Sequence, residues 1–101
     1  MRMMMLVQCP IEPFNSLIRN GTVGSVMKKI LDDIKPEAAY FSEREGKRGC
    51  VLIVDVQSPS DVPRLAEPWF LNFNADVELR ICMLPEDLGK ANLEALGKKW
   101  G

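Results

Sequence analysis

Acid–base or nucleophilic chemistry in this chain would depend on carboxylates, one tyrosine and three cysteines, because the sequence contains no histidine. Ser-His-Asp and Cys-His sites are therefore excluded. Glu37 and Glu67 are the best carboxylate candidates, since each adjoins a proline and a turn rich in aromatic residues. Desolvation in such a turn would raise the pKa of a carboxylic acid. The alternative, and the more common situation, is that both are partly solvated charges at the ends of elements.

A small-ligand pocket is predicted around the segment AEPWF, residues 66–70. Pro68 lies inside an otherwise helical pattern, where its ring clashes with the preceding turn and removes a hydrogen bond. The helix is therefore expected to kink or end near Glu67 and to turn Trp69 and Phe70 towards the sheet. The alternative is a plain corner between a helix and a strand, in which the aromatic residues belong to the core.

Arg19 and Tyr40 are the further polar groups expected at this pocket. Arg19 lies among apolar neighbours just before a glycine, so it either pairs with Glu67 across the helix layer or binds an anionic group. Tyr40 offers a hydroxyl if its side of a strand faces the helices, and its neighbour Phe41 must then face the other way. A few polar groups that converge on an apolar concavity are typical of small-ligand sites. The candidate ligand-binding residues are Arg19, Tyr40, Glu67, Trp69 and Phe70.

The number and spacing of the cysteines favour free thiols over a metal site or a set of disulfides. Cys9, Cys50 and Cys82 are odd in number, show no CxxC spacing and lie in apolar, strand-like runs. Without histidine a zinc site is poorly supplied with ligands. We expect all three to be free, and buried in a protein from a reducing compartment. Neither a metal nor a cofactor is predicted.

Length, charge and hydropathy restrict the class of protein and its partners. The 101 residues fit one domain spanning 1–101, and the net charge is −1. Phosphate binding needs a concentrated positive surface, so a nucleic-acid partner is not expected. No run approaches the ~20 apolar residues of a membrane span, and the opening MRMMMLVQCP does not fit a signal peptide. The protein is expected to be cytoplasmic.

Hydrophobic periodicity predicts the order strand, helix, strand, strand, helix, strand, helix. The first helical region, 14–34, contains Gly21 and Gly24 and is expected to be kinked or divided there, with Thr22 or Ser25 capping its second part. The predicted strands are 3–9, 37–45, 50–56 and 75–84. A turn is expected at 46–49, a helix from about Pro59, and a frayed C-terminal helix after 85.

The first six of these elements match the split βαβ, or ferredoxin-like, unit. Right-handed crossovers would place both helices on one face of an antiparallel sheet. The strand 50–56 is apolar on both of its faces, so the face without helices needs another cover. We therefore expect a homodimer formed through that face. Trp100, almost at the end of the chain, is either loose or docked on a neighbour, and docking is the favoured interpretation.

Several segments resemble a family of small bacterial proteins of the dimeric α+β barrel class. They are FNSLIRNGTVG (14–24), KPEAAYF (35–41), AEPWF (66–70) and PEDLGKA (85–91), so the resemblance spans nearly the whole chain. It implies an α+β fold, a ferredoxin-like βαββαβ unit with a C-terminal helix, that pairs as a dimeric α+β barrel. Some members carry the label pantothenate synthetase, but this sequence lacks both the histidine-rich ATP motif and a glycine-rich phosphate loop.

A looser similarity links the chain to the muconolactone isomerases. It rests on DVQSPSDVPRL followed by ADVELRICML, within residues 55–84. That similarity implies a cofactor-independent enzyme acting on a small carbonyl or lactone compound. Two other functions stay open at this point: a dimer that binds a small organic molecule between helices and sheet, and a purely structural dimer without a ligand.

Overall fold

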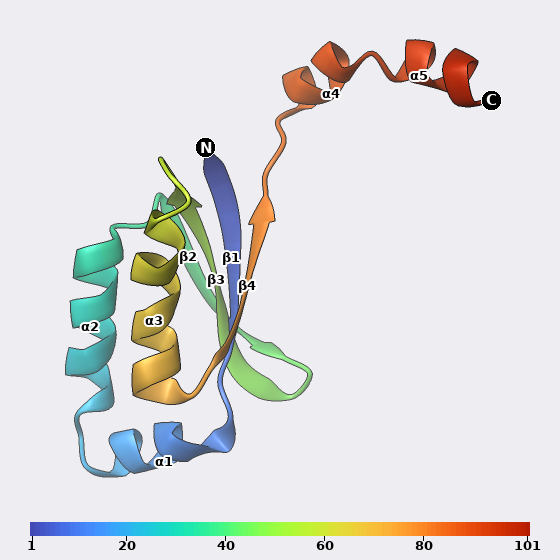
Figure 1. The fold of residues 1–101 in the computed structure, drawn as a ribbon. Helices are drawn as coiled ribbons and strands as arrows, with labels where there is room; N and C mark the ends of the chain where they lie inside the picture. The colour runs from blue at the N-terminus through green and yellow to red at the C-terminus, as the bar shows by residue number, and fades with distance from the viewer.

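The computed structural model describes all 101 residues, Met1–Gly101. Four strands form one antiparallel sheet in the order β2-β3-β1-β4, and α2 and α3 lie together on one of its faces (Figure 1). This is the predicted α+β, ferredoxin-like βαββαβ arrangement. The elements are β1 Arg2–Gln8, α1 Ile11–Arg19, α2 Val23–Ile34, β2 Ala38–Arg44, β3 Lys47–Asp55, α3 Asp61–Phe73, β4 Asp76–Ile81, α4 Pro85–Ala91 and α5 Leu93–Trp100.

The hydrophobic core lies between the sheet and the helices, on what we call the covered face. Successive side chains of a strand point to opposite sides, so Met5 and Val7 of the central strand β1 are fully buried while their neighbours are only partly so. Met5 pairs with Leu52 of β3. Trp69 and Phe73 of α3 complete the centre of the core, each with 0% of its surface exposed.

The first helical region is divided in two, as the glycines predicted. Gly21 has φ +76° between α1 and α2, a conformation that side chains other than glycine rarely adopt. Thr22 occupies the predicted N-cap position of α2, but its side chain makes no capping hydrogen bond. Asn20 Oδ1 accepts from the backbone N–H of Thr22 instead, and Ser25 Oγ donates to the Thr22 carbonyl.

The hairpin turn is shorter than predicted. Glu45 and Gly46 form it alone, with φ +53° and +76°, and Arg44 pairs directly with Lys47. Positive φ at both central residues matches the right-handed twist of the flanking strands. β3 therefore begins at Lys47 instead of Cys50, which places residues 47–49 in the strand.

Helix α3 contradicts the predicted break near Glu67. It begins at Asp61, passes through Pro68 and ends at Phe73, before Asn74 at φ +52°. A proline in a helix costs one hydrogen bond, but packing of an apolar face contributes most of a helix's stability in a protein. Because α3 continues to Phe73, that residue is buried in the core together with Trp69. This packing outweighs the hydrogen bond lost at Pro68.

The C-terminal segment leaves the body of the molecule (Figure 1). The predicted last strand ends at Ile81 instead of residue 84, and the predicted single helix is two, α4 and α5, separated by Asn92 at φ +53°. The molecule measures 59 × 28 × 20 Å, and its radius of gyration is 17.1 Å, against about 13 Å for a compact domain of this length. We call residues 82–101 the C-terminal arm. No helix has the length and apolar character needed to cross a membrane.

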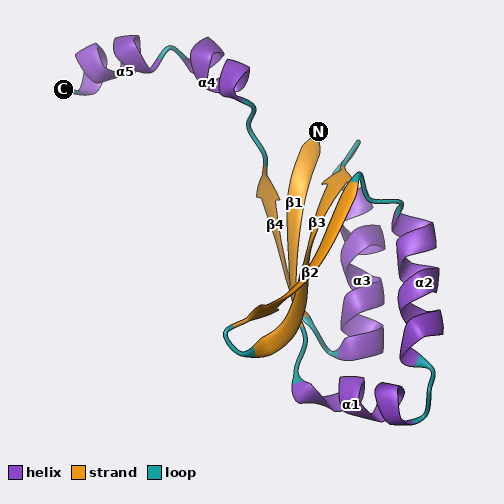
Figure 2. Cartoon of the chain, turned by 180° about the vertical axis from the view of Figure 1, so that it is seen from behind, coloured by secondary structure: helices purple, strands orange, loops and turns teal.

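The second face of the sheet carries no helix, as Figure 2 shows from behind. We call it the open face. Cross-strand pairs of β1 and β3 form its apolar centre, Met4 with Ile53 and Leu6 with Val51, all partly buried. Tyr40 of β2 stands beside Val51 and is 67% exposed. The sequence correctly predicted that β3 is apolar on both faces.

Candidate ligand-binding cleft

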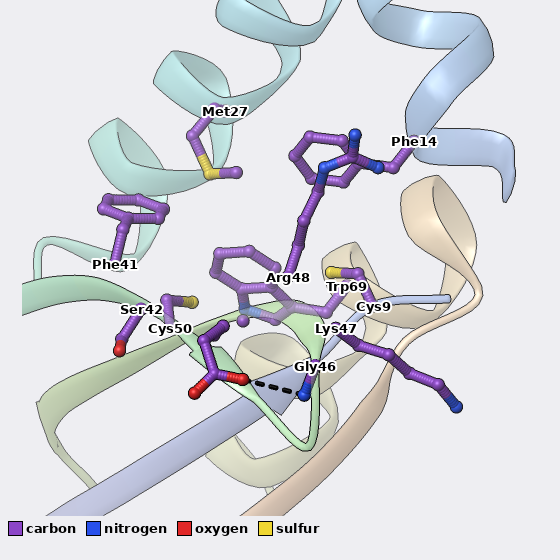
Figure 3. Close-up of a pocket in the computed structure, with 12 residues that line it drawn as sticks. Cys9, Phe14, Met27, Phe41, Ser42, Gly46, Lys47, Arg48, Cys50 and Trp69 are labelled. Carbon is purple, nitrogen blue, oxygen red and sulfur yellow. Dashed lines mark hydrogen bonds between the residues drawn. The ribbon is translucent and has the colours of Figure 1, made fainter. Parts of the chain in front are cut away.

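A cleft opens at the end of the sheet where the β2–β3 hairpin faces the helices (Figure 3). Its volume is about 350 Å³, within the range of small-molecule sites. The cleft is lined by six apolar or sulfur-containing side chains and by a more polar rim on the hairpin. The former are Cys9, Phe14, Met27, Phe41, Cys50 and Trp69, and the rim comprises Ser42, Glu43 and Gly46–Gly49.

Sheet register decides which side chains reach this cleft. Cys50 lies on the covered face of β3, and Phe41 is its partner on β2, so Phe41 also faces the helices. Cys9 follows β1 and donates its backbone N–H to the Arg48 carbonyl at 2.8 Å, which fixes it beside the hairpin. Tyr40 points to the opposite side of β2 by the same alternation. The predicted contribution of the Tyr40 hydroxyl is therefore wrong, because that residue lies on the open face.

Aromatic rings pack against one another on the helix side of the cleft. The Phe14 ring lies 5.1 Å from that of Phe73, and the Trp69 ring lies 5.9 Å from Phe73, between centroids. The Arg48 guanidinium sits 4.8 Å from the centroid of the Phe14 ring, within cation–π range. This contact brings a positive charge from the hairpin over an apolar wall.

Trp69 contributes an unusual polar group to this wall. Its Nε1 is buried and has no hydrogen-bond partner. Leaving a buried donor unpaired costs about 1–3 kcal/mol, and buried polar groups are nearly always paired. The indole N–H is therefore an unused donor in a side chain that lines the cleft.

Burial controls the chemistry of the two thiols in the cleft. It raises the pKa of Cys50 to about 12, with Cys9 adding to the rise. Burial also raises the pKa of Cys9, partly offset by the positive charge of Arg48. Because the thiolate is the reactive form, both groups are protonated and weakly nucleophilic at neutral pH. All three cysteines of the chain are free, but only Cys9 and Cys50 are buried, whereas Cys82 beyond β4 is partly exposed, contrary to the expectation that all three are buried.

The rim carries two positive charges and one negative charge, all exposed to solvent. Glu43 Oε2 accepts from the backbone N–H of Gly46 at 2.7 Å, which is the dashed line in Figure 3. Lys47 and Arg48 come from the same hairpin. The local excess of one positive charge favours a ligand that carries an anionic or strongly polar group at the mouth of the cleft.

The structure brings only one of the five candidate ligand-binding residues to this cleft, namely Trp69. Glu67 is exposed and lines a separate hollow on the outer side of α2 and α3. Phe70 is 40% exposed on α3. Arg19 lies 3.6 Å from Glu12, so the predicted pair of Arg19 with Glu67 is wrong.

The second candidate carboxylate, Glu37, lies outside the cleft as well. Its side chain accepts from Arg2 Nε at 3.0 Å and is more than half exposed. Both carboxylates are thus exposed to solvent, as the alternative interpretation held, although only Glu37 lies at the end of an element and Glu67 lies in the middle of α3. Neither stands in an environment that removes it from water.

Several cleft residues were not singled out from the sequence as ligand contacts. Arg48 belongs to a basic pair interpreted as part of a solvated hairpin tip, and only the two-residue turn reveals that it lies in a strand. Phe14 and Met27 follow the apolar stripe that any amphipathic helix shows. The one available signal was alternation in β2, which places Phe41 opposite Tyr40.

A scan against protein-family models and a search of the curated proteins both give no match for this chain.

Proposed function

We propose that the protein binds a small, mostly apolar organic molecule in the cleft between the β2–β3 hairpin and the helices. The observation that carries this proposal is the unpartnered Nε1 of Trp69, a residue that lines the cleft. A ligand oxygen that accepts from this N–H would satisfy the donor. The apolar part of the ligand would pack against Phe14, Met27 and Phe41.

The rim favours ligands with a carboxylate or a lactone carbonyl. Arg48 is held over Phe14, close to the apolar wall, and can donate to such a group while its stem stays packed. Lys47 adds charge but lies further out on the hairpin. A ligand with an apolar body and one anionic end fits both features of the cleft.

An isomerase acting on a small carbonyl or lactone compound is the second candidate. It needs a group that moves a proton at the ligand, and the titratable side chains in the cleft apart from the two cations are Cys9, Cys50 and Glu43. Burial keeps the two thiols protonated at neutral pH, which makes them poor bases. Glu43 is tied to the Gly46 N–H at the rim. Binding without turnover is therefore the function that this arrangement supports best.

A thermal-shift screen against small carboxylic acids and lactones tests the proposal. A ligand that binds only the folded protein adds about 2.7 kcal/mol of stability at a hundredfold excess over its Kd. Trp69→Phe should remove the shift, and Arg48→Gln should weaken it for acids more than for lactones. Glu67→Gln is the matched control, since it removes a charge outside the cleft and should leave the shift unchanged. A hit that is unaffected by Trp69→Phe would contradict the proposed site.

We also propose that the protein is a cytoplasmic homodimer that pairs through its open face. The apolar centre of that face supports the pairing, and three free thiols fit a reducing compartment. A purely structural dimer remains the third candidate function. Light scattering at micromolar concentration should give the mass of a dimer. Ile53→Lys, on the open face, should give a monomer, whereas Leu71→Lys, exposed on α3, should not.

A further inference from the structure

We propose that the C-terminal arm docks on a second copy of the chain and holds that copy against the open face. This inference rests on the proposed homodimer and goes beyond it, because it assigns a function to a segment that the pairing of two sheets alone does not use. The partner is a second copy of this chain, and the contact is apolar.

The first observation is an uncovered apolar stripe along the arm. In α5, Leu93, Leu96 and Trp100 lie three, four and seven residues apart and therefore share one face. Leu93 is 59% and Trp100 is 78% exposed. Leu84 and Leu88 share a face at α4 in the same way. Every residue from Met83 to Gly101 is exposed, so the body of the chain leaves most of this stripe uncovered.

The second observation is that both helices of the arm are well formed despite this exposure. Asp87 Oδ2 accepts from the Leu84 N–H at 2.8 Å at the start of α4, and Asn92 Oδ1 accepts from the Ala95 N–H at 3.3 Å in α5. Helices of seven and eight residues are too short to be stable alone in water. Local capping defines their ends, but a packing surface is needed to hold them.

The third observation is the direction of the arm. It leaves the end of β4, passes beyond the end of the sheet and turns to the side away from α2 and α3 (Figures 1 and 2). A body seated on the open face would therefore lie next to the arm. One partner can cover both uncovered apolar surfaces at once, and a second copy brings the same two surfaces in return. Two copies that contact each other through the same two surfaces are related by a twofold axis, and this assembly stops at a dimer.

The charges of the arm favour a protein surface over a membrane. Its acidic side chains are Glu86, Asp87 and Glu94, and its basic ones are Lys90, Lys98 and Lys99, three of each sign. A helix that lies on anionic lipid has a polar face rich in Lys and Arg, which this balance does not give. The chain as a whole also buries little of its surface, with only 14 of its 101 residues buried, and small domains of this kind gain most from a partner.

The test compares two aspartate substitutions on α5 in the full-length protein. Leu96→Asp places a charge in the apolar stripe, and Ala95→Asp places the same charge on the opposite side of the helix. We expect Leu96→Asp to raise the dimer dissociation constant about 100-fold in analytical ultracentrifugation, since a buried leucine is lost and a charge would be buried. Ala95→Asp should leave the constant within a few-fold of the original.

Trp100 supplies a second measurement that does not depend on the variants folding alike. With Trp69→Phe, Trp100 is the remaining tryptophan of the two in the chain. Its fluorescence should be blue-shifted at concentrations where the dimer forms and should shift to the red on dilution. Solvent-exposed emission in a confirmed dimer, or equal constants for both aspartate variants, would overturn the arm contact and leave the homodimer standing.

Two other outcomes are also decisive. A chain that is monomeric at every accessible concentration would overturn the homodimer and the arm contact together. A blue shift of Trp100 that requires vesicles containing anionic lipid, and that does not follow protein concentration, would assign the arm to a membrane surface and overturn a second copy as its partner.

Discussion

At the scale of single residues, Trp69 combines a core position with an unpaired donor. Its ring is fully buried against Phe73, yet its Nε1 has no partner. The sequence predicted that the aromatic residues in AEPWF are mostly core, and it also predicted a pocket there. Both descriptions fit this side chain, because Trp69 lies at the boundary between the filled core and the cleft.

We predict that Trp69→Phe and Trp69→Ala differ sharply in stability. Phenylalanine keeps most of the packing and removes a donor whose unpaired burial costs about 1–3 kcal/mol, so the free energy of unfolding should change by about 1 kcal/mol or less. Alanine leaves a cavity and should cost about 3–5 kcal/mol. Urea denaturation measures both. A large loss for Trp69→Phe would mean that the N–H is paired in the folded protein.

Cys50 gives a prediction about pH. Burial raises its pKa from 9.0 to about 12, so between those values the unfolded chain releases a proton that the folded protein keeps. The contribution of the protonated Cys50 thiol to the free energy of unfolding is therefore fully present below pH 9 and is lost as the pH rises towards 12. The free energy of unfolding should fall by roughly 1.4 kcal/mol per pH unit in this window.

Urea denaturation at pH values from neutral to strongly alkaline measures this slope. Cys50→Ala should flatten it, because the titrating group is gone. Val54→Ala is the matched control, since it truncates another buried residue of the same strand and should lower stability while preserving the slope. Equal slopes for both variants would show that other groups cause the alkaline loss.

At the scale of elements, hydrophobic periodicity predicted the type and order of the helices and strands. Glycine and proline, which disfavour helix, gave a correct prediction at one helix and a wrong one at another. Gly21 does divide α1 from α2, because its positive φ has no place inside a helix. Pro68 does not end α3, because the apolar face of the helix continues to Phe73 in the core. A sequence reveals the cost of a proline but not the packing that outweighs it.

The proline in α3 should carry a measurable cost. Proline is about 3 kcal/mol less favourable than alanine in a helix interior, so we expect Pro68→Ala to raise the free energy of unfolding by about 1–3 kcal/mol. Pro63→Ala in the first turn of the same helix is the control. The first N–H groups of a helix have no partner within it, so this change should stay within about 0.5 kcal/mol. Calorimetric melting of both variants provides the comparison, and equal effects would refute the assignment of the cost to the helix interior.

The candidate site was less predictable than the elements, because it depends on register. A shift of one residue moves a strand's side chains to the opposite face. Tyr40 and Phe41 are neighbours in the sequence, and only the pairing of Phe41 with Cys50 decides which one faces the helices. Arg48 joins the cleft only because the hairpin turn has two residues instead of four.

At the scale of the whole molecule, the fold followed from the order of elements, but the shape did not. The ferredoxin-like order and the helix-free face could both be inferred from periodicity. The C-terminal arm could not, because its apolar residues predict a helix without indicating whether that helix packs on its own domain or on another. Contacts between chains leave no periodic signal of their own.

The proposed homodimer predicts that thermal stability depends on protein concentration. Association stabilises the folded state by mass action, so the melting temperature should rise steadily between about 1 and about 100 µM. In Ile53→Lys a charge lies in the apolar centre of the open face, beside Met4. Its melting temperature should be lower and independent of concentration, because its folded state is a monomer throughout.

The control for this experiment is Leu71→Lys, which introduces the same side chain at an exposed position of α3. It should keep the concentration dependence of the unmodified protein, since neither the open face nor the C-terminal arm includes α3. A melting temperature that does not change with concentration in the unmodified protein would contradict the homodimer. The apolar centre of the open face and the stripe on the arm would then be exposed in a stable monomer, where contiguous apolar patches of that kind are uncommon.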